Sequence, residues 1–203
     1  MTFIFTRMVF GAIIFAVCII IIRHAKIQKR NRMYIIAFFA TSILITILSI
    51  VPLENAFVTF PTAEEAFAYR STAKIAVVVE GKDSALVVGQ KKDKIIESII
   101  PRVNDGWKIS SVLQEKTLLQ AFDESYIIYT YYTSENSDIY VRITNTTGKP
   151  IDISDNNNSV YVCLDGDEMS DDSISTYYAF INRSQESVEI YINGKVYPIS
   201  TTQ

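Results

Sequence analysis

The carboxylate side chains of this chain are most concentrated in one short stretch near its C-terminus. Five acidic residues fall within eight positions there: Asp165, Asp167, Glu168, Asp171 and Asp172. Carboxylate oxygens are ligands that Ca²⁺ prefers, so this stretch is a candidate calcium site. Its spacing differs from that of an EF-hand loop, because the glycine comes at the second position and no glutamate stands at the twelfth. The other interpretation is a solvated loop between two strands.

A second polar loop lies just upstream, with Asp152, Asp155 and three consecutive asparagines at 156–158. If the fold brings the two loops together, their carboxylates would also suit the hydrolysis of a glycosidic bond, which uses two acids about 5–10 Å apart. Trp107 is the one tryptophan of the chain, so no concentration of indole rings indicates a sugar groove. A hydrolase with paired carboxylates is therefore the runner-up class.

Most familiar catalytic chemistries are excluded by the absence of histidine after residue 24. His24 is the one histidine of the chain, and Cys18 and Cys163 are its two cysteines. Serine and cysteine nucleophiles need an imidazole base, and zinc sites use histidine or several cysteines. Neither a P-loop nor a G-x-G-x-x-G motif is present, so we expect no cofactor and no enzymatic activity. Cys163 is predicted to pack as a small apolar residue of a strand.

Ser71 and Lys74 match the S-x-x-K motif of penicillin-recognising enzymes. That motif requires the serine to open a helix, whereas Lys74 begins the strand-like run KIAVVVE. No K-T-G or S-D-N partner motif follows. We interpret the match as a chance occurrence.

Tyrosines form the last group of candidate binding residues. Tyr140, Tyr161 and Tyr191 each alternate with aliphatic residues and are predicted on the opposite face of their strands. An exposed face of this kind would stack on sugars or bind a partner protein. The competing interpretation is cross-strand aromatic pairing that stabilises the sheet.

The elements that must position these residues are predicted to be strands of one antiparallel domain, residues 61–203. Apolar and polar residues alternate in many short runs separated by turn residues, above all Asn193-Gly194. The runs are 74–80, 85–90, 94–101, 107–113, 126–133, 139–145, 160–164, 176–182, 187–192 and 195–199. Residues 117–122 fit either a strand or a helical turn. This pattern favours a sandwich or open barrel, with an immunoglobulin-like strand spacing from Ile139 onward.

One short helix is predicted to precede the first strand. Thr62 fits the N-cap position, and Glu65, three residues later, completes a capping box. Acidic residues in the first turn also suit the helix dipole. We therefore expect a helix from Ala63 to about Arg70.

Two long apolar runs occupy the N-terminal part of the chain, at about residues 3–22 and at 34–51. About 20 helical residues cross a hydrocarbon core of about 30 Å, so both runs are predicted to be transmembrane helices. No small-residue cleavage site follows either run, which favours retained anchors over a signal peptide. Residues 1–52 are therefore predicted to form a transmembrane hairpin, and 53–60 a short stalk.

The loop between the two runs, 23–33, carries five basic residues: Arg23, Lys26, Lys29, Arg30 and Arg32. Short basic loops remain on the cytoplasmic side of a membrane, so these residues are expected to determine the topology. The N-terminus and the β domain are then predicted to lie outside, in a multi-pass protein of the cell membrane. The lipid bilayer is its expected partner.

The charge differs sharply between the two parts of the chain. Residues 1–59 contain six Lys or Arg and one acid, whereas residues 60–203 contain thirteen Lys or Arg and twenty-one acids. An acidic surface repels phosphate, so the larger part is not expected to bind nucleic acid. The abundance of Ile, Lys, Asn and Tyr, without disulfide pairs, indicates a bacterial source.

These observations together predict a membrane-anchored extracytoplasmic β-domain protein of the bacterial cell envelope. It is expected to act as a non-enzymatic binding, sensing or accessory module, with another envelope protein or a cell-wall component as a further partner. The alternatives are the envelope hydrolase with paired carboxylates and a calcium-binding surface domain.

Overall fold

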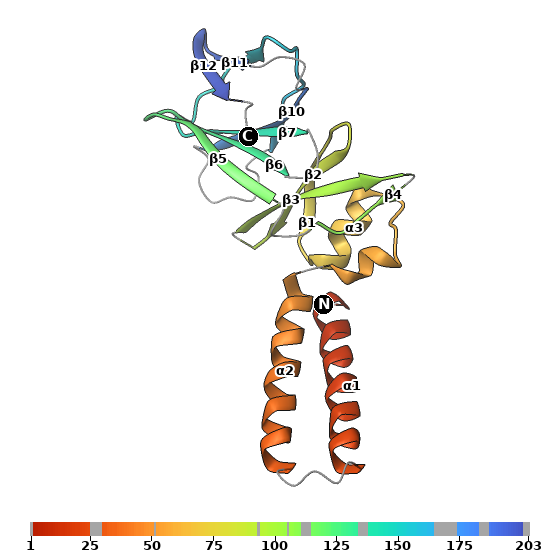
Figure 1. Cartoon of the computed structure of the whole chain (residues 1–203). Helices are drawn as coiled ribbons and strands as arrows, with labels where there is room; N and C mark the ends of the chain where they lie inside the picture. Colours follow the sequence, from red (N-terminus) through yellow and green to blue (C-terminus); the bar gives the residue numbers. More distant parts are fainter. Residues whose placement is uncertain are drawn as a thin grey trace.

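A computed structural model describes residues 2–24, 30–50, 52–92, 94–104, 106–110, 115–133, 138–164, 174–182 and 187–200. Strands dominate the chain after residue 73, which confirms the prediction of a mainly-β region. Figure 1 shows this region as stacked sheets, with two long helices that project away from it.

The two long helices, α1 (Thr2–His24) and α2 (Arg30–Ile50), form an antiparallel hairpin. Gly11 permits their close approach, since a Cβ atom at that position would clash with Cδ1 of Ile45. The rings of Phe15 and Phe38 meet edge to face with their centroids 6.0 Å apart. The hydroxyl of Thr41 donates to the carbonyl of Ala37 within α2 at 2.8 Å.

The predicted transmembrane hairpin is wrong. Within the residues that the structure describes, none of the helices combines the length and the apolar character needed to traverse a bilayer. Charged positions limit the apolar runs: the uncharged residues 8–22 of α1 rise about 22 Å and residues 33–50 of α2 about 27 Å, against about 30 Å of hydrocarbon. The fold class with two transmembrane helices, the two-pass topology and the multi-pass membrane localisation are corrected with it.

The segment predicted as a stalk packs against the β region. It contains the 3₁₀ helix η1 (Leu53–Ala56), and Phe60 exchanges two backbone hydrogen bonds with Trp107. The Asn55 side chain accepts from the N–H of Ile109 and donates to its carbonyl, both at 2.8 Å. Residues 53–60 are therefore part of the folded structure.

The short helix α3 (Ala63–Arg70) forms as predicted. The hydroxyl oxygen of Thr62 accepts the backbone N–H of Glu65 at 3.2 Å, which satisfies one of the donors left open at a helix start. Phe67 packs on β2 (Ser84–Lys91), where Gly89 leaves room for the ring: a Cβ at Gly89 would lie 2.7 Å from Cζ of Phe67. This packing buries the apolar side of α3 against the first sheet.

The described strands form three sheets. The first has the order β1-β2-β3-β4, with β1 (Lys74–Glu80), β2 (Ser84–Lys91), β3 (Lys94–Val103) and β4 (Gly106–Trp107). The second has the order β5-β6-β7-β10-β9, with β5 (Glu115–Phe122), β6 (Tyr126–Thr133), β7 (Ile139–Asn145), β10 (Ser175–Ile181) and β9 (Val162–Leu164). The third has the order β12-β11-β8, with β12 (Lys195–Ser200), β11 (Ser187–Ile192) and β8 (Ile153–Asp155). All pairings are antiparallel.

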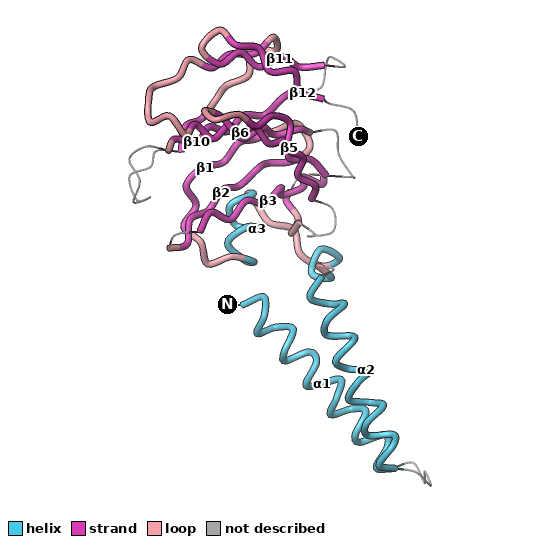
Figure 2. Tube along the Cα trace, turned by 90° about the vertical axis from the view of Figure 1, so that its left-hand side faces the viewer, coloured by secondary structure: helices cyan, strands magenta, loops and turns pink. Residues whose placement is uncertain are grey.

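The sheets stack in layers, with the second sheet in the middle (Figure 2). One of its faces packs on the first sheet through Tyr131, Tyr140 and Tyr178. Its other face packs on the third sheet through aliphatic residues such as Val141 and Ile143. The arrangement is thus a stack of three sheets with α3 on the outside of the first, rather than a two-sheet sandwich.

Candidate functional site

Part of the predicted site lies outside the described residues. The calcium candidates Asp165, Asp167, Glu168, Asp171 and Asp172 all fall there, as do Lys26 and Lys29 of the basic loop. Arg23 lies in the last turn of α1, and Arg30 and Arg32 lie in the first turn of α2. Their predicted role in membrane topology falls with the transmembrane hairpin. In the part of the chain that the structure describes, no three His, Cys, Asp or Glu side chains are grouped to hold a metal ion.

The three candidate tyrosines do not share an exposed face. Tyr140 is fully buried between the first and second sheets, and its hydroxyl lies 2.8 Å from that of Ser84. Tyr161 donates to Asp155, and Tyr191, on β11, donates to Glu189. For Tyr140, the face opposite the aliphatics is covered because the first sheet packs on it. Tyr191 instead lies beside the exposed Glu189 on the third sheet, and Tyr161 lies in the loop before β9, so the three tyrosines do not form one patch.

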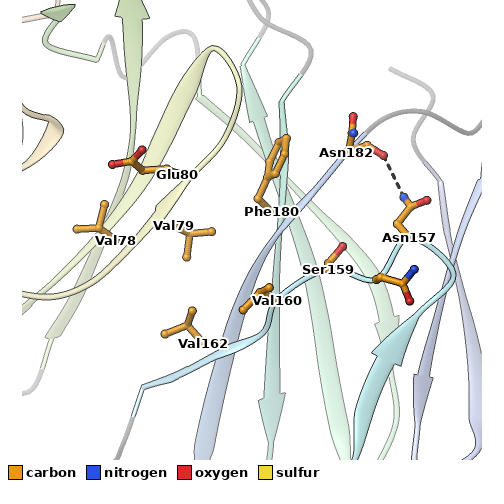
Figure 3. Close-up of a pocket in the computed structure, with 10 residues that line it drawn as sticks. Val78, Val79, Glu80, Asn157, Ser159, Val160, Val162, Phe180 and Asn182 are labelled. Carbon is orange, nitrogen blue, oxygen red and sulfur yellow. Dashed lines mark hydrogen bonds between the residues drawn. The ribbon is translucent and has the colours of Figure 1, made fainter.

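A groove opens where the first and second sheets end side by side. Its volume is about 400 Å³, within the range of ligand clefts in proteins. We call it the β1–β9 groove; it is lined by Val78, Val79, Glu80, Asn157, Asn158, Ser159, Val160, Val162, Phe180 and Asn182. Figure 3 shows the β1 residues on one side of it and Val160, Val162 and Phe180 facing them.

The wall on the side of β1 is a strand edge. Val78, Val79 and Glu80 are consecutive, and successive side chains of a strand point to opposite faces, so the groove meets β1 along its backbone. Val79 indeed packs between the sheets, while Val78 packs toward α3. Among the described strands β1 pairs with β2 alone, so the outward backbone groups of its other edge have no strand partner within the described residues.

The opposite wall is the loop between β8 and β9, and Asp155 positions it. Its Oδ1 accepts the backbone N–H groups of Asn157 at 2.9 Å and Ser159 at 3.0 Å, and its Oδ2 accepts the hydroxyl of Tyr161 at 2.9 Å. Asn158 takes the left-handed conformation, φ 55°, which asparagine tolerates. Burial, and then the Asp155 carboxylate, raise the pKa of Tyr161, so its hydroxyl remains a donor at neutral pH.

This wall combines asparagine amides with aliphatic side chains. Nδ2 of Asn157 donates to the carbonyl of Asn182 at 3.0 Å, which joins the loop to the end of β10. Val160 is 77% exposed, so its aliphatic side chain is accessible to a ligand in the groove. The groove thus combines an unpaired strand edge, exposed aliphatic surface and neutral hydrogen-bonding groups.

Sequence reasoning missed the polar cluster that holds the first two sheets together. Glu97 of β3 accepts the hydroxyls of Tyr178 at 2.7 Å and Tyr131 at 2.8 Å, and its oxygens lie 3.0 and 3.1 Å from Nη1 of Arg142. The guanidinium of Arg142 also stacks 4.6 Å from the ring centre of Tyr129. Because these residues come from β3, β6, β7 and β10, the cluster fixes the two sheets that border the groove. Glu97 is a single acid within the apolar run IIESII, residues 95–100, and nothing in that run indicates this role.

The electrostatics of the cluster keep its two tyrosines and its arginine protonated. Burial raises the pKa of Tyr131 and of Tyr178, and the charge of Glu97 raises them further. Burial alone would lower the pKa of Arg142, but the Glu97 carboxylate, together with Tyr131 and Tyr178, raises that pKa overall. Both hydroxyls and the guanidinium therefore remain donors to Glu97 across the physiological range.

A second, smaller cavity of about 140 Å³ bears on the hydrolase interpretation, because Glu97 and Glu115 both line it. Glu115 Oε1 accepts the hydroxyl of Ser98 at 2.8 Å and the N–H of Ile99 at 3.2 Å. Glu97 is held by Arg142 and two tyrosines, as described above. Both carboxylates thus join strands to one another, which does not support a role in acid–base catalysis.

No protein-family model, curated protein or solved structure matches this chain.

Proposed function

We propose that this chain is a non-enzymatic binding module that takes up an extended segment of a partner protein in the β1–β9 groove. The segment adds as a strand to the free edge of β1. The observation that carries the proposal is the lining of the groove by three consecutive residues of an edge strand.

Strand addition fits the two walls of the groove. Main-chain hydrogen bonds to the edge supply affinity in this recognition mode, and pockets for alternate side chains supply specificity. Val160 and Val162 offer aliphatic surface for every second side chain of the segment. A β-bulge between Ile75 and Val77 interrupts the edge, so the segment pairs with residues 77–80.

A polypeptide fits this lining better than a carbohydrate. Sugar sites commonly present aromatic faces for stacking, and the one aromatic ring of the groove is that of Phe180, which is half-buried. The aliphatic surface of the groove matches apolar side chains instead. Oligosaccharides therefore serve as the comparison ligands in the test.

The full chain would be used to select binders from a random decapeptide library, with a panel of cell-wall oligosaccharides screened in parallel. A selected peptide is then synthesised in two forms, N-methylated at its odd or at its even backbone amides. Strand addition predicts that one form loses at least about tenfold in affinity while the other still binds, because alternate amides of the added strand face β1. Equal binding by both forms, or binding of oligosaccharides alone, would contradict the proposal.

A pair of exposed valines locates the site. Val160→Asp places a charge in the groove and should abolish peptide binding, whereas Val196→Asp, on β12, should leave the affinity within about twofold. Both side chains are exposed, at 77% and 46%, so neither change should unfold the chain. Loss of binding in the Val196 variant alone would place the site elsewhere.

A further inference from the structure

The groove contains one charged position. Of the ten described residues that line it, Glu80 is the one ionisable side chain, and the others are aliphatic, aromatic, amide or hydroxyl residues. Glu80 is exposed and lies at the end of β1. Its carboxylate is therefore free to meet a side chain of a strand that adds to this edge.

We infer that the segment bound in the groove carries a lysine or arginine at the position that lies beside Glu80, within an otherwise uncharged, alternately apolar sequence. This inference rests on the strand-addition function proposed above and names the class of partner that this site selects. The partner is a basic extended peptide.

Charge complementarity at two ranges supports this partner. At short range, a basic side chain next to Glu80 is attracted to its carboxylate, while an acidic one is repelled and leaves that carboxylate facing a like charge. At longer range, residues 60–203 contain thirteen Lys or Arg against twenty-one acids, which favours the approach of a cationic segment at low salt.

The neutral part of the groove limits where the basic residue can lie. A charge elsewhere in the groove would lose its hydration without gaining a counter-charge, because the surrounding side chains are aliphatic: Val78 and Val79 on one side, Val160 and Val162 on the other. The asparagine amides hydrogen-bond uncharged groups equally well. A charge is thus favoured at one register position of the segment and disfavoured at its neighbours.

The test compares peptides selected from the same library by four full-length proteins: the wild type, Glu80→Gln, Glu80→Lys and Glu64→Lys. Glu64 is an exposed acid on α3 and serves as the matched control for overall charge. Wild type and Glu64→Lys should both enrich Lys or Arg at one fixed position of an alternating apolar pattern. Glu80→Lys should enrich Asp or Glu at that position, and Glu80→Gln should keep the apolar pattern without a charge preference.

Binding constants complete the test, with N-acetylated peptides so that no terminal ammonium group competes. Replacing the selected basic residue with norleucine should weaken binding to the wild type about threefold and to Glu80→Gln by less than 1.5-fold, the size expected of a mostly exposed ion pair. Selection of alternating apolar peptides with no basic position, or no change of preference in Glu80→Lys, would overturn this inference and leave the proposed function standing. Failure of every protein to select peptides would overturn the proposed function itself.

Discussion

At the residue scale, Asp155 shows how one buried carboxylate shapes the groove wall. We predict that Asp155→Asn lowers the free energy of unfolding by about 1–3 kcal/mol, because the amide can no longer accept from two backbone N–H groups and the Tyr161 hydroxyl together. Denaturant unfolding measures the change. Asp152→Asn, an exposed acid three residues earlier, is the control and should stay within about 0.5 kcal/mol of the wild type.

Glu97 carries the second residue-scale prediction. Glu97→Gln leaves Arg142 half-buried without a counter-ion, and we expect it to cost about 2–3 kcal/mol of stability, somewhat below the range for fully buried pairs because both side chains keep some exposure, 16% and 24%. Glu80→Gln, at an exposed position, should change stability by less than about 0.5 kcal/mol. Thermal and denaturant unfolding of the two variants compare them directly; equal losses would contradict a structural role for the Glu97 cluster.

At the scale of elements, the turn between β5 and β6 is tied to β12 through Asp123. This carboxylate accepts from Nζ of Lys195 at 2.8 Å, from the hydroxyl of Tyr197 at 2.7 Å and from two backbone N–H groups. The Lys195 and Tyr197 hydrogen bonds, with the backbone N–H groups, hold the pKa of Asp123 well below its ordinary value of 3.8, while the same contact raises the pKa of Lys195 to about 12.

The sign of the pH dependence follows from these shifts. Because its pKa is lowered on folding, the Asp123 carboxylate stabilises the folded chain above pH 3.8. This stabilisation is lost progressively as the pH falls below that value. We therefore predict that the stability difference between wild type and Asp123→Asn is largest near neutral pH and shrinks below about pH 4. Unfolding curves for both proteins across that range provide the measurement. A difference that grows toward low pH would contradict the assignment.

The bounds of several strands, but not of all, follow from the sequence pattern. Alternation with strong turns gave β1, β6, β7 and β11 their bounds, and the N-cap at Thr62 placed α3. β8 was not predicted, because three residues are too few to show alternation and its pairing with β11 is a tertiary contact. β9 starts at Val162 rather than at residue 160, since Asp155 holds the preceding residues in a loop.

At the scale of the whole molecule, the stacking of sheets decides what the alternating pattern means. The sequence placed Tyr140 on the face opposite the aliphatics and left open whether that face is exposed. In the structure both faces of the second sheet are buried, because the first sheet covers one and the third sheet covers the other. Alternation distinguishes the two faces of a strand without showing which of them is covered. The groove was equally hidden from sequence reasoning, because its walls are residues 78–80 and 157–162, which are brought together by packing alone.

The most direct test of the central claim, that β1 is the edge to which a partner strand adds, is residue-resolved amide hydrogen exchange with and without a saturating selected peptide. The outward amides of residues 77–80 should exchange at least about tenfold more slowly in the complex, because the added strand accepts their hydrogen bonds. The amides of β12, an edge strand of the third sheet, should keep their rates. Protection of β12 or another edge, with unchanged exchange along β1, would contradict the account.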